Sequence, residues 1–78
     1  MNNFNYKNIE KAHKKIEDKV IKTPLISNDF INNLLNAKIY FKLENLQKTG
    51  SFKLRGALNK LLSLSDKQKN KGVIAVST

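Results

Sequence analysis

The sequence predicts an α/β fold that is incomplete over the 78 residues given. Amphipathic helix patterns alternate with strand patterns, in the order helix, strand, helix, strand. The last apolar run, Val73 to Val76, is uninterrupted, as is typical of a strand buried on both faces of a parallel sheet. Such a strand needs neighbours on both edges and helices on both faces, and one strand-helix-strand unit cannot supply them. We therefore expect the first part of a larger α/β enzyme, ending where a strand delivers its carboxyl end, the usual place for a ligand.

The first predicted element is an amphipathic helix over residues 7–21. Its apolar positions recur at steps of three and four residues: Ile9, Ala12, Ile16 and Val20. Thr23-Pro24 ends the helix, because the residue before a proline avoids the α region. Leu25-Ile26 is then expected to be a short extended segment.

A second, shorter helix and a strand are predicted next. Ser27-Asn28-Asp29 is a suitable N-cap region. The helix that follows has helically spaced apolar residues: Phe30, Ile31, Leu34 and Leu35. Asn36-Ala37 is expected to form a turn. Lys38 to Glu44 alternates apolar and polar side chains, which is the pattern of a strand.

The remaining chain predicts a loop, a helix and a connection before the last strand. Residues 45–51 are polar and contain Gly50, which favours a loop. Residues 52–64 have helical periodicity, with an apolar face expected to be buried: Leu54, Ala57, Leu58, Leu61 and Leu62. Residues 65–72 are a charged surface connection that has room for one helical turn.

Composition limits the class of protein. The chain has no cysteine, so neither a disulfide nor a thiolate metal site supports the fold. No apolar run approaches the roughly 20 residues of a membrane span. The first seven residues lack the apolar stretch of a secretory signal. We expect a soluble, cytoplasmic protein without a membrane partner.

The net charge of +9 raises the question of nucleic-acid binding. The basic residues are scattered over separate segments, and no aromatic-rich strand interleaves them as in an RNA-binding sheet. Solvated lysines on exposed faces explain the charge better. A small basic module that binds nucleic acid or a protein partner stays as a second hypothesis.

Lys53 lies where a flexible loop becomes an apolar helix. A free lysine amine, with a pKa of about 10.4, becomes a nucleophile only through desolvation or a positive neighbourhood. The amide groups at a helix N-terminus supply a positive neighbourhood. Gly50 and Ser51 permit a close approach of the backbone, and Phe52 offers a flat apolar face. The residues alone explain equally well a solvated lysine that follows Ser51 as an N-cap.

The stretch from Lys42 to Ala57, KLENLQKTGSFKLRGA, closely resembles the lysine signature of the fold type II pyridoxal-phosphate enzymes. The resemblance is to the threonine/serine dehydratase (threonine ammonia-lyase) branch, which includes serine racemase. Residues 9–25 resemble the N-terminal helix and Thr-Pro-Leu motif of that branch. Gly72 to Ser77 resembles the strand before its Gly-Asn-His turn. The likeness covers nearly all 78 residues.

The resemblance implies a role for four residues. Lys53 would bind pyridoxal 5'-phosphate covalently and act as the catalytic base, and Phe52 would pack against the ring of the cofactor. Ser77 and Thr78 would lie in the loop that binds the substrate carboxylate. Arg55 is expected to be structural, in an ion pair or on the helix surface.

The implied reaction is β-elimination from threonine or serine, which gives a 2-oxo acid and ammonia. The resemblance also implies a role in isoleucine biosynthesis and assembly of the enzyme into a homo-oligomer. At the position of Thr78 serine racemases have serine, and many dehydratases have alanine. Threonine retains a hydroxyl but adds a methyl group, which favours the dehydratase and leaves a racemase, or another β-hydroxy amino acid as substrate, as alternatives.

The resemblance also implies that much of the enzyme lies outside this sequence. Residues 1–78 would be the N-terminal segment of the cofactor-binding catalytic domain, in a fold like that of the tryptophan synthase β subunit, ending near the start of the small subdomain. The sequence contains no Gly-rich phosphate loop and no Gly-Asn-His turn. These residues by themselves are therefore expected to be inactive.

Overall fold

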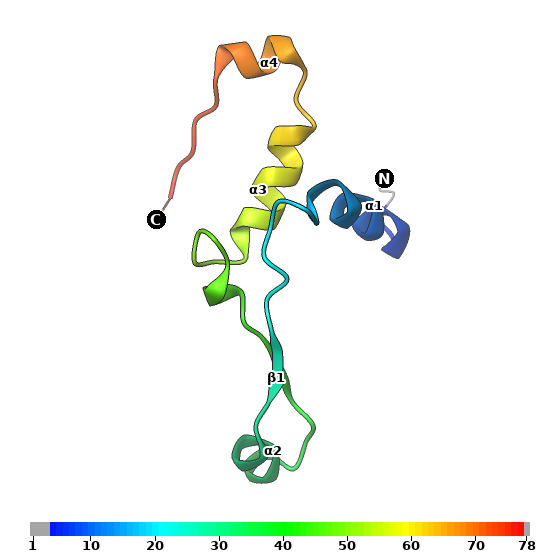
Figure 1. The fold of residues 1–78 in the computed structure, drawn as a ribbon, viewed down its shortest axis with the longest axis vertical. Coiled ribbons are helices and arrows are strands. Elements are labelled where there is room, and N and C mark those ends of the chain that lie inside the picture. The colour runs from blue at the N-terminus through cyan, green and yellow to red at the C-terminus, as the bar shows by residue number, and fades with distance from the viewer. Residues whose placement is uncertain (1–3, 78) are drawn as a thin grey trace.

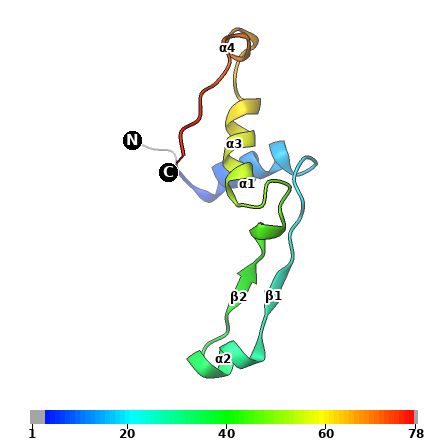
Figure 2. The ribbon, with the colours of Figure 1, turned by 90° about the vertical axis from the view of Figure 1, so that its left-hand side faces the viewer.

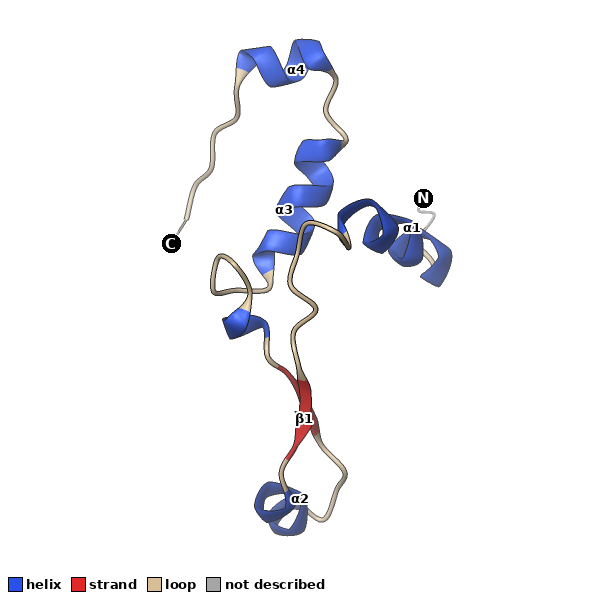
Figure 3. Ribbon diagram, viewed as in Figure 1, coloured by secondary structure: helices blue, strands red, loops and turns tan. Residues whose placement is uncertain are grey.

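The computed structural model describes residues 4–77 of the chain. Helices are the main regular secondary structure of these residues, and two short strands form a small sheet (Figures 1 and 3). None of the helices within residues 4–77 is long and apolar enough to cross a membrane. The elements follow one another as α1 (Tyr6–Ile16), β1 (Leu25–Ser27), α2 (Asp29–Leu35), β2 (Tyr40–Lys42), the 3₁₀ helix η1 (Glu44–Leu46), α3 (Lys53–Leu62) and α4 (Asp66–Lys71).

Helix α1 confirms the predicted amphipathic helix but ends earlier than predicted. Asn5 caps its start, and its last helical residue is Ile16, not Ile21. The backbone amides of Lys19 and Val20 both donate to the carbonyl of Ile16, at 2.8 and 3.2 Å. This turn closes the helix C-terminus in place of a further helical turn. Val20 therefore lies outside the helix, in the segment that leads to β1.

Strands β1 and β2 form an antiparallel hairpin with α2 at its tip, as Figure 2 shows. The prediction of a short extended segment before α2 and a strand after it is confirmed. Asn28 caps α2, and its side-chain oxygen accepts a hydrogen bond from the amide of Ile31 at 3.0 Å. Asn36 ends the helix in the left-handed conformation, with φ of 51°. The strand partners are Leu25 with Lys42, Ile26 with Phe41, and Ser27 with Tyr40.

Helix α3 begins at Lys53 and packs against α1. At its far end the Lys15 amine donates to the Ser63 hydroxyl over 2.8 Å. Helix α4 follows after a short connection, where Ser65 and Gln68 form a capping box. Most of residues 65–72, predicted to be a charged connection, thus form a short helix.

The predicted strand from Val73 to Val76 is wrong for this structure. These residues form an extended segment without strand pairing, which runs back from α4 toward the level of α3 (Figure 1). Their side chains are in solvent: Val73 is 64% exposed, Ile74 95% and Val76 93%. A strand needs a hydrogen-bonding neighbour, and within residues 4–77 no other strand lies beside this segment. The apolar pattern from Val73 to Val76 therefore does not correspond to a buried strand within residues 4–77.

The described residues form almost no hydrophobic core. Ile16 is the one buried hydrophobic side chain among them, and the predicted buried face of α3 contains no buried residue. The molecule measures 53 × 28 × 27 Å. Its radius of gyration is 16.6 Å, whereas a compact chain of this length would have about 11.5 Å. The chain is therefore open, and its large apolar side chains face outward.

Candidate functional site

The candidate site is built at the turn that leads into α3. The backbone amide of Gly50 donates to the carbonyl of Gln47 at 2.8 Å, and Gly50 has a φ of 77°. This left-handed conformation favours glycine, because it carries no Cβ penalty. The Ser51 hydroxyl then accepts a hydrogen bond from the amide of Lys53 at 3.2 Å. The chain thus turns sharply and places Lys53 as the first residue of the helix.

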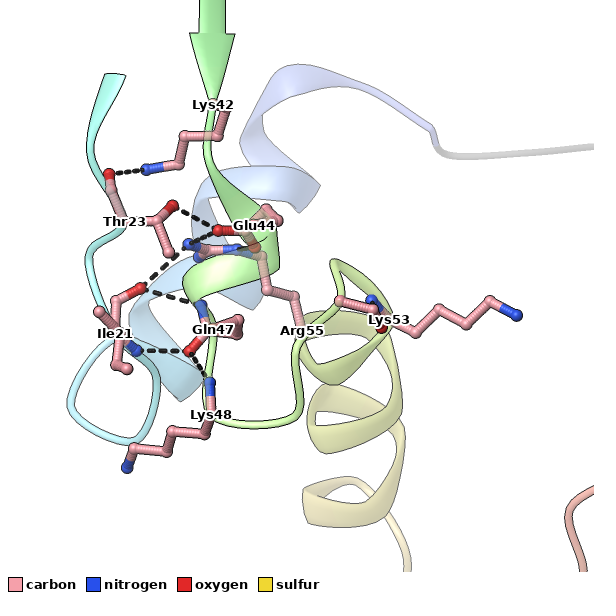
Figure 4. A network of polar contacts seen from close by, with 9 residues as sticks. Ile21, Thr23, Lys42, Glu44, Gln47, Lys48, Lys53 and Arg55 are labelled. Carbon is pink, nitrogen blue, oxygen red and sulfur yellow. Dashed lines mark hydrogen bonds and ion pairs between the residues drawn. The ribbon is translucent and has the colours of Figure 1, made fainter. Parts of the chain in front are cut away.

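Lys53 has an exposed side chain that points away from the rest of the turn (Figure 4). The expected position at a helix N-terminus is confirmed. Desolvation, the other way to make the amine a nucleophile, is not provided by the described residues, because Lys53 is exposed. Phe52, immediately before Lys53, is 67% exposed and is the N-cap of α3 without a side-chain capping bond. Ser51 therefore does not act as the N-cap residue, although its hydroxyl is bonded close by.

Of the two predicted substrate-binding residues, only Ser77 is described. It is exposed and lies in the extended segment that follows α4, in a different part of the chain from the turn before α3. Thr78 lies outside the described residues. The structure thus brings Phe52 and Lys53 together at the start of α3, and the role of Ser77 and Thr78 stays a prediction.

A polar network lies on the opposite side of the α3 N-terminus from the Lys53 amine (Figure 4). The carboxylate of Glu44 accepts hydrogen bonds from Arg55 Nε at 2.5 Å and from Arg55 Nη2 at 3.3 Å. It also accepts a hydrogen bond from the hydroxyl of Thr23. The predicted structural role of Arg55 is confirmed, and its ion-pair partner is Glu44.

The bonds to Glu44 favour its ionised form. Hydrogen bonds from Arg55 and then from Thr23, against a smaller opposing effect of burial, lower the pKa of Glu44 from 4.5 to about 2. The same pair raises the pKa of Arg55, chiefly through its hydrogen bond with Glu44. The pair is therefore charged on both sides throughout the neutral range.

Gln47 ties the same loop to the segment before β1. Its Oε1 accepts from the amide of Ile21 at 2.7 Å and from that of Lys48 at 3.2 Å, and its Nε2 donates to the carbonyl of Ile21 at 2.9 Å. Gln47 is only 4% exposed and Thr23 only 3%. These two polar residues are the best-buried part of the site, and buried polar groups are paired in this way as a rule.

The sequence pattern does not indicate that Thr23, Glu44 and Gln47 form a network. Each lies in a different predicted segment, and the bonds join residues 21 and 26 positions apart. The local sequence pattern contains no signal for contacts over such separations.

The chain is similar to proteins of a known family. Residues 16–78 match the family described as "Pyridoxal-phosphate dependent enzyme". This match spans well over half of the chain. The chain therefore belongs to the pyridoxal-phosphate dependent enzyme family, and its cofactor is pyridoxal phosphate.

Individual relatives indicate which branch of this family the chain is similar to. The chain is 51% identical over 72 residues to the serine racemase of Dictyostelium discoideum, covering 92% of this chain and 22% of the relative. It is 49% identical over 70 residues to a catabolic L-threonine dehydratase of Staphylococcus aureus, and this match covers 88% of this chain and 20% of the relative. The structure of maize serine racemase superimposes with a TM-score of 0.78 at 39% identity, covering 86% of this chain and 21% of that one.

These matches confirm the α/β fold of a fold type II pyridoxal-phosphate enzyme. They also show that the chain spans only about a fifth of the length of the curated relatives it matches. The resemblance to the threonine dehydratase and serine racemase branch, predicted from the motif around Lys53, is confirmed.

Proposed function

We propose that Lys53 is the residue that binds pyridoxal phosphate covalently, in an enzyme that eliminates water from threonine or serine. The observation that carries this proposal is the position of Lys53. It is the first residue of α3, its amine is exposed, and an exposed aromatic ring precedes it. A primary amine on the residue that follows an exposed aromatic side chain suits an aldehyde cofactor with an aromatic ring. The residues present therefore fit the group.

The residues of this chain would divide the work as follows. Lys53 would hold the cofactor through its Nζ, and Phe52 would cover one side of the ring. When bound, pyridoxal phosphate supplies an electron sink for the bonds at Cα of an amino acid. Lys53 Nζ, released when the amine of the substrate takes its place, would stay next to Cα and accept the proton there. Ser77 and Thr78 would hold the substrate carboxylate with their hydroxyls and backbone amides.

Threonine would give 2-oxobutanoate and ammonia, and serine would give pyruvate and ammonia. The name of the Staphylococcus relative supports a catabolic setting over isoleucine biosynthesis. We further propose that the activity belongs to a longer polypeptide, of which this chain is the N-terminal part of the catalytic domain. The short share of the relatives that it spans and its open, nearly coreless shape support this. We call that polypeptide the intact enzyme, and we expect it to form a homo-oligomer.

Racemisation of serine is the second candidate activity, because a relative at 51% identity is named a serine racemase. Thr78 carries a hydroxyl that could deliver a proton to the second face of Cα. Incubation of the intact enzyme with L-serine, followed by chiral chromatography, distinguishes the dehydratase activity from the racemase activity. A dehydratase yields pyruvate and ammonia, and a racemase accumulates D-serine.

The test of the main proposal is the identity of the modified lysine. Borohydride reduction of the intact enzyme should fix the cofactor to Lys53, and peptide mapping should find it there. Lys53→Ala should abolish the visible absorbance of the bound cofactor, and activity should fall by several orders of magnitude, since both attachment and proton transfer are lost. Lys60→Ala, which removes an exposed lysine of the same helix, is the matched control and should change neither. Attachment of the cofactor to any other lysine would refute the assignment.

A further inference from the structure

The first turn of α3 lacks most of the usual means of fixing a helix N-terminus. Its N-cap, Phe52, makes no side-chain hydrogen bond to the turn, and no residue of α3 is buried. The bond between Ser51 and the Lys53 amide stays within the turn and ties it to no other element. The bond from α1 to Ser63 acts at the other end of the helix. Helix α1 packs against α3 without burying any of its residues, so a directional polar contact at the first turn is needed to fix the direction in which α3 starts.

Arg55 makes that contact. From the first turn of α3 it reaches Glu44 Oε1 at 2.5 Å and Oε2 at 3.3 Å, a two-bond arrangement that fixes orientation as well as distance. Arg55 Nη2 also lies 3.4 Å from the carbonyl of Ile21. The Arg55 side chain is 27% exposed and that of Glu44 13%, so water competes little with the pair. Glu44 is itself held from its other side by the buried hydroxyl of Thr23.

Because Lys53 and Arg55 share one helical turn, the contact that fixes Arg55 also fixes the direction of Lys53. Successive residues turn by about 100° around a helix axis, so Lys53 and Arg55, two residues apart, project about 200° from each other. Figure 4 shows this directly, with Arg55 directed into the network and Lys53 directed away from it. Because one turn of helix is stiff, holding Arg55 on one side fixes the direction of Lys53 on the other.

We propose that Glu44 and Arg55 are positioning residues for Lys53. Their ion pair clamps the first turn of α3 to η1, which Thr23 in turn ties to the segment before β1. The clamp sets the place at which the Lys53 amine meets the cofactor. This inference rests on the proposed function of Lys53. In the proposed reaction neither Glu44 nor Arg55 touches the reacting atoms.

The first test uses the cofactor-free intact enzyme. Glu44→Gln keeps the shape of the side chain and removes the charge that holds Arg55. Hydrogen–deuterium exchange of the amides in residues 52–56 should become faster, on the order of tenfold, because the turn opens locally without its clamp. Peptides from α2 should exchange at the rate of the unchanged protein. Glu17→Gln, which removes an exposed carboxylate paired with His13 on α1, is the matched control and should leave residues 52–56 unaffected.

The second test uses the holoenzyme. In Glu44→Gln the visible circular dichroism of the bound cofactor should weaken, because its attachment point is no longer held in one direction. The kcat should fall on the order of tenfold, with KM changed by less than about threefold, as expected when reacting groups are misplaced but substrate still binds. Arg55→Lys keeps the positive charge and loses the two-bond fork, so it should give the same result. The double variant should be no worse than either single variant, since both remove one clamp.

The outcomes separate this proposal from the one on which it rests. If Glu44→Gln and Arg55→Lys match Glu17→Gln in exchange, circular dichroism and kcat, while reduction still fixes the cofactor to Lys53, the clamp is refuted and the proposed function stands. If reduction fixes the cofactor elsewhere, both proposals fail. Should Glu44→Gln fail to fold, Arg55→Lys decides by the same measurements.

Discussion

Thr23 and Gln47 are buried polar residues in a chain that buries little else. The Gln47 amide group has a partner for its oxygen and for its nitrogen, both on the backbone of Ile21. The Thr23 hydroxyl donates to Glu44, and its carbonyl accepts from the amine of Lys42 at 2.8 Å. A buried polar group costs free energy unless it is paired, so this set is stable as a unit and sensitive to the loss of any member.

The depressed pKa of Glu44 predicts a pH dependence of stability. A carboxylate whose folded-state pKa lies below its unfolded value stabilises the fold above the unfolded pKa, and this contribution is lost as pH falls through the folded pKa. For Glu44 the window runs from about 4.5 down to about 2. The groups that face it are Arg55, Thr23 and Gln47, of which only Arg55 is charged.

Denaturant unfolding of the intact enzyme at a series of pH values measures this contribution. Glu44→Gln should be less stable than the unchanged protein above pH 4.5, and the difference should shrink toward zero near pH 2. Glu17→Gln should show a small difference at every pH, since its carboxylate is exposed. A Glu44→Gln difference that stays constant from pH 7 to 2 would contradict the assigned pKa.

Sequence reasoning predicted elements well where the signal is local. A cap within Ser27-Asn28-Asp29, a turn at Asn36 and the start of a helix near Lys53 all depend on residues within a few positions, and all were found. The strand predicted at Val73 to Val76 depends on a neighbour that periodicity cannot supply, and it did not form. The Glu44–Arg55 pair crosses a loop, so the sequence indicated a structural Arg55 without its partner.

Two glycines near the start of α3 make a matched pair for testing the local structure. Neither would bring an added Cβ within 4 Å of another group. Gly56 lies inside the helix, so Gly56→Ala should stabilise it by about 0.5–1 kcal/mol. Gly50 has φ of 77°, so Gly50→Ala should destabilise the turn by about 1 kcal/mol or more.

Urea unfolding of the intact enzyme gives both free energies of unfolding. If Gly56→Ala raises the free energy of unfolding and Gly50→Ala lowers it, the helix and the left-handed turn are confirmed. Two destabilising substitutions would show that the face of α3 around Gly56 is closely covered by residues beyond the described ones.

At the scale of the whole molecule, the open shape predicts weak cooperativity for the isolated chain. With one buried hydrophobic residue among residues 4–77, little apolar surface is removed from water to offset the loss of chain entropy. Circular dichroism of the 78-residue chain should therefore show a shallow thermal transition or none. A sharp transition, together with salt-sensitive binding of nucleic acid, would favour the small basic module instead.

The exposed segment from Val73 to Val76 has a consequence for handling the isolated polypeptide. It is short, apolar, uncharged and extended, with both backbone edges open, which makes it a template for strand addition by a neighbouring molecule. The net charge of +9 keeps such molecules apart at low ionic strength. Added salt shortens the range of that repulsion, so purification buffers rich in salt should promote aggregation of this polypeptide where dilute ones keep it dispersed.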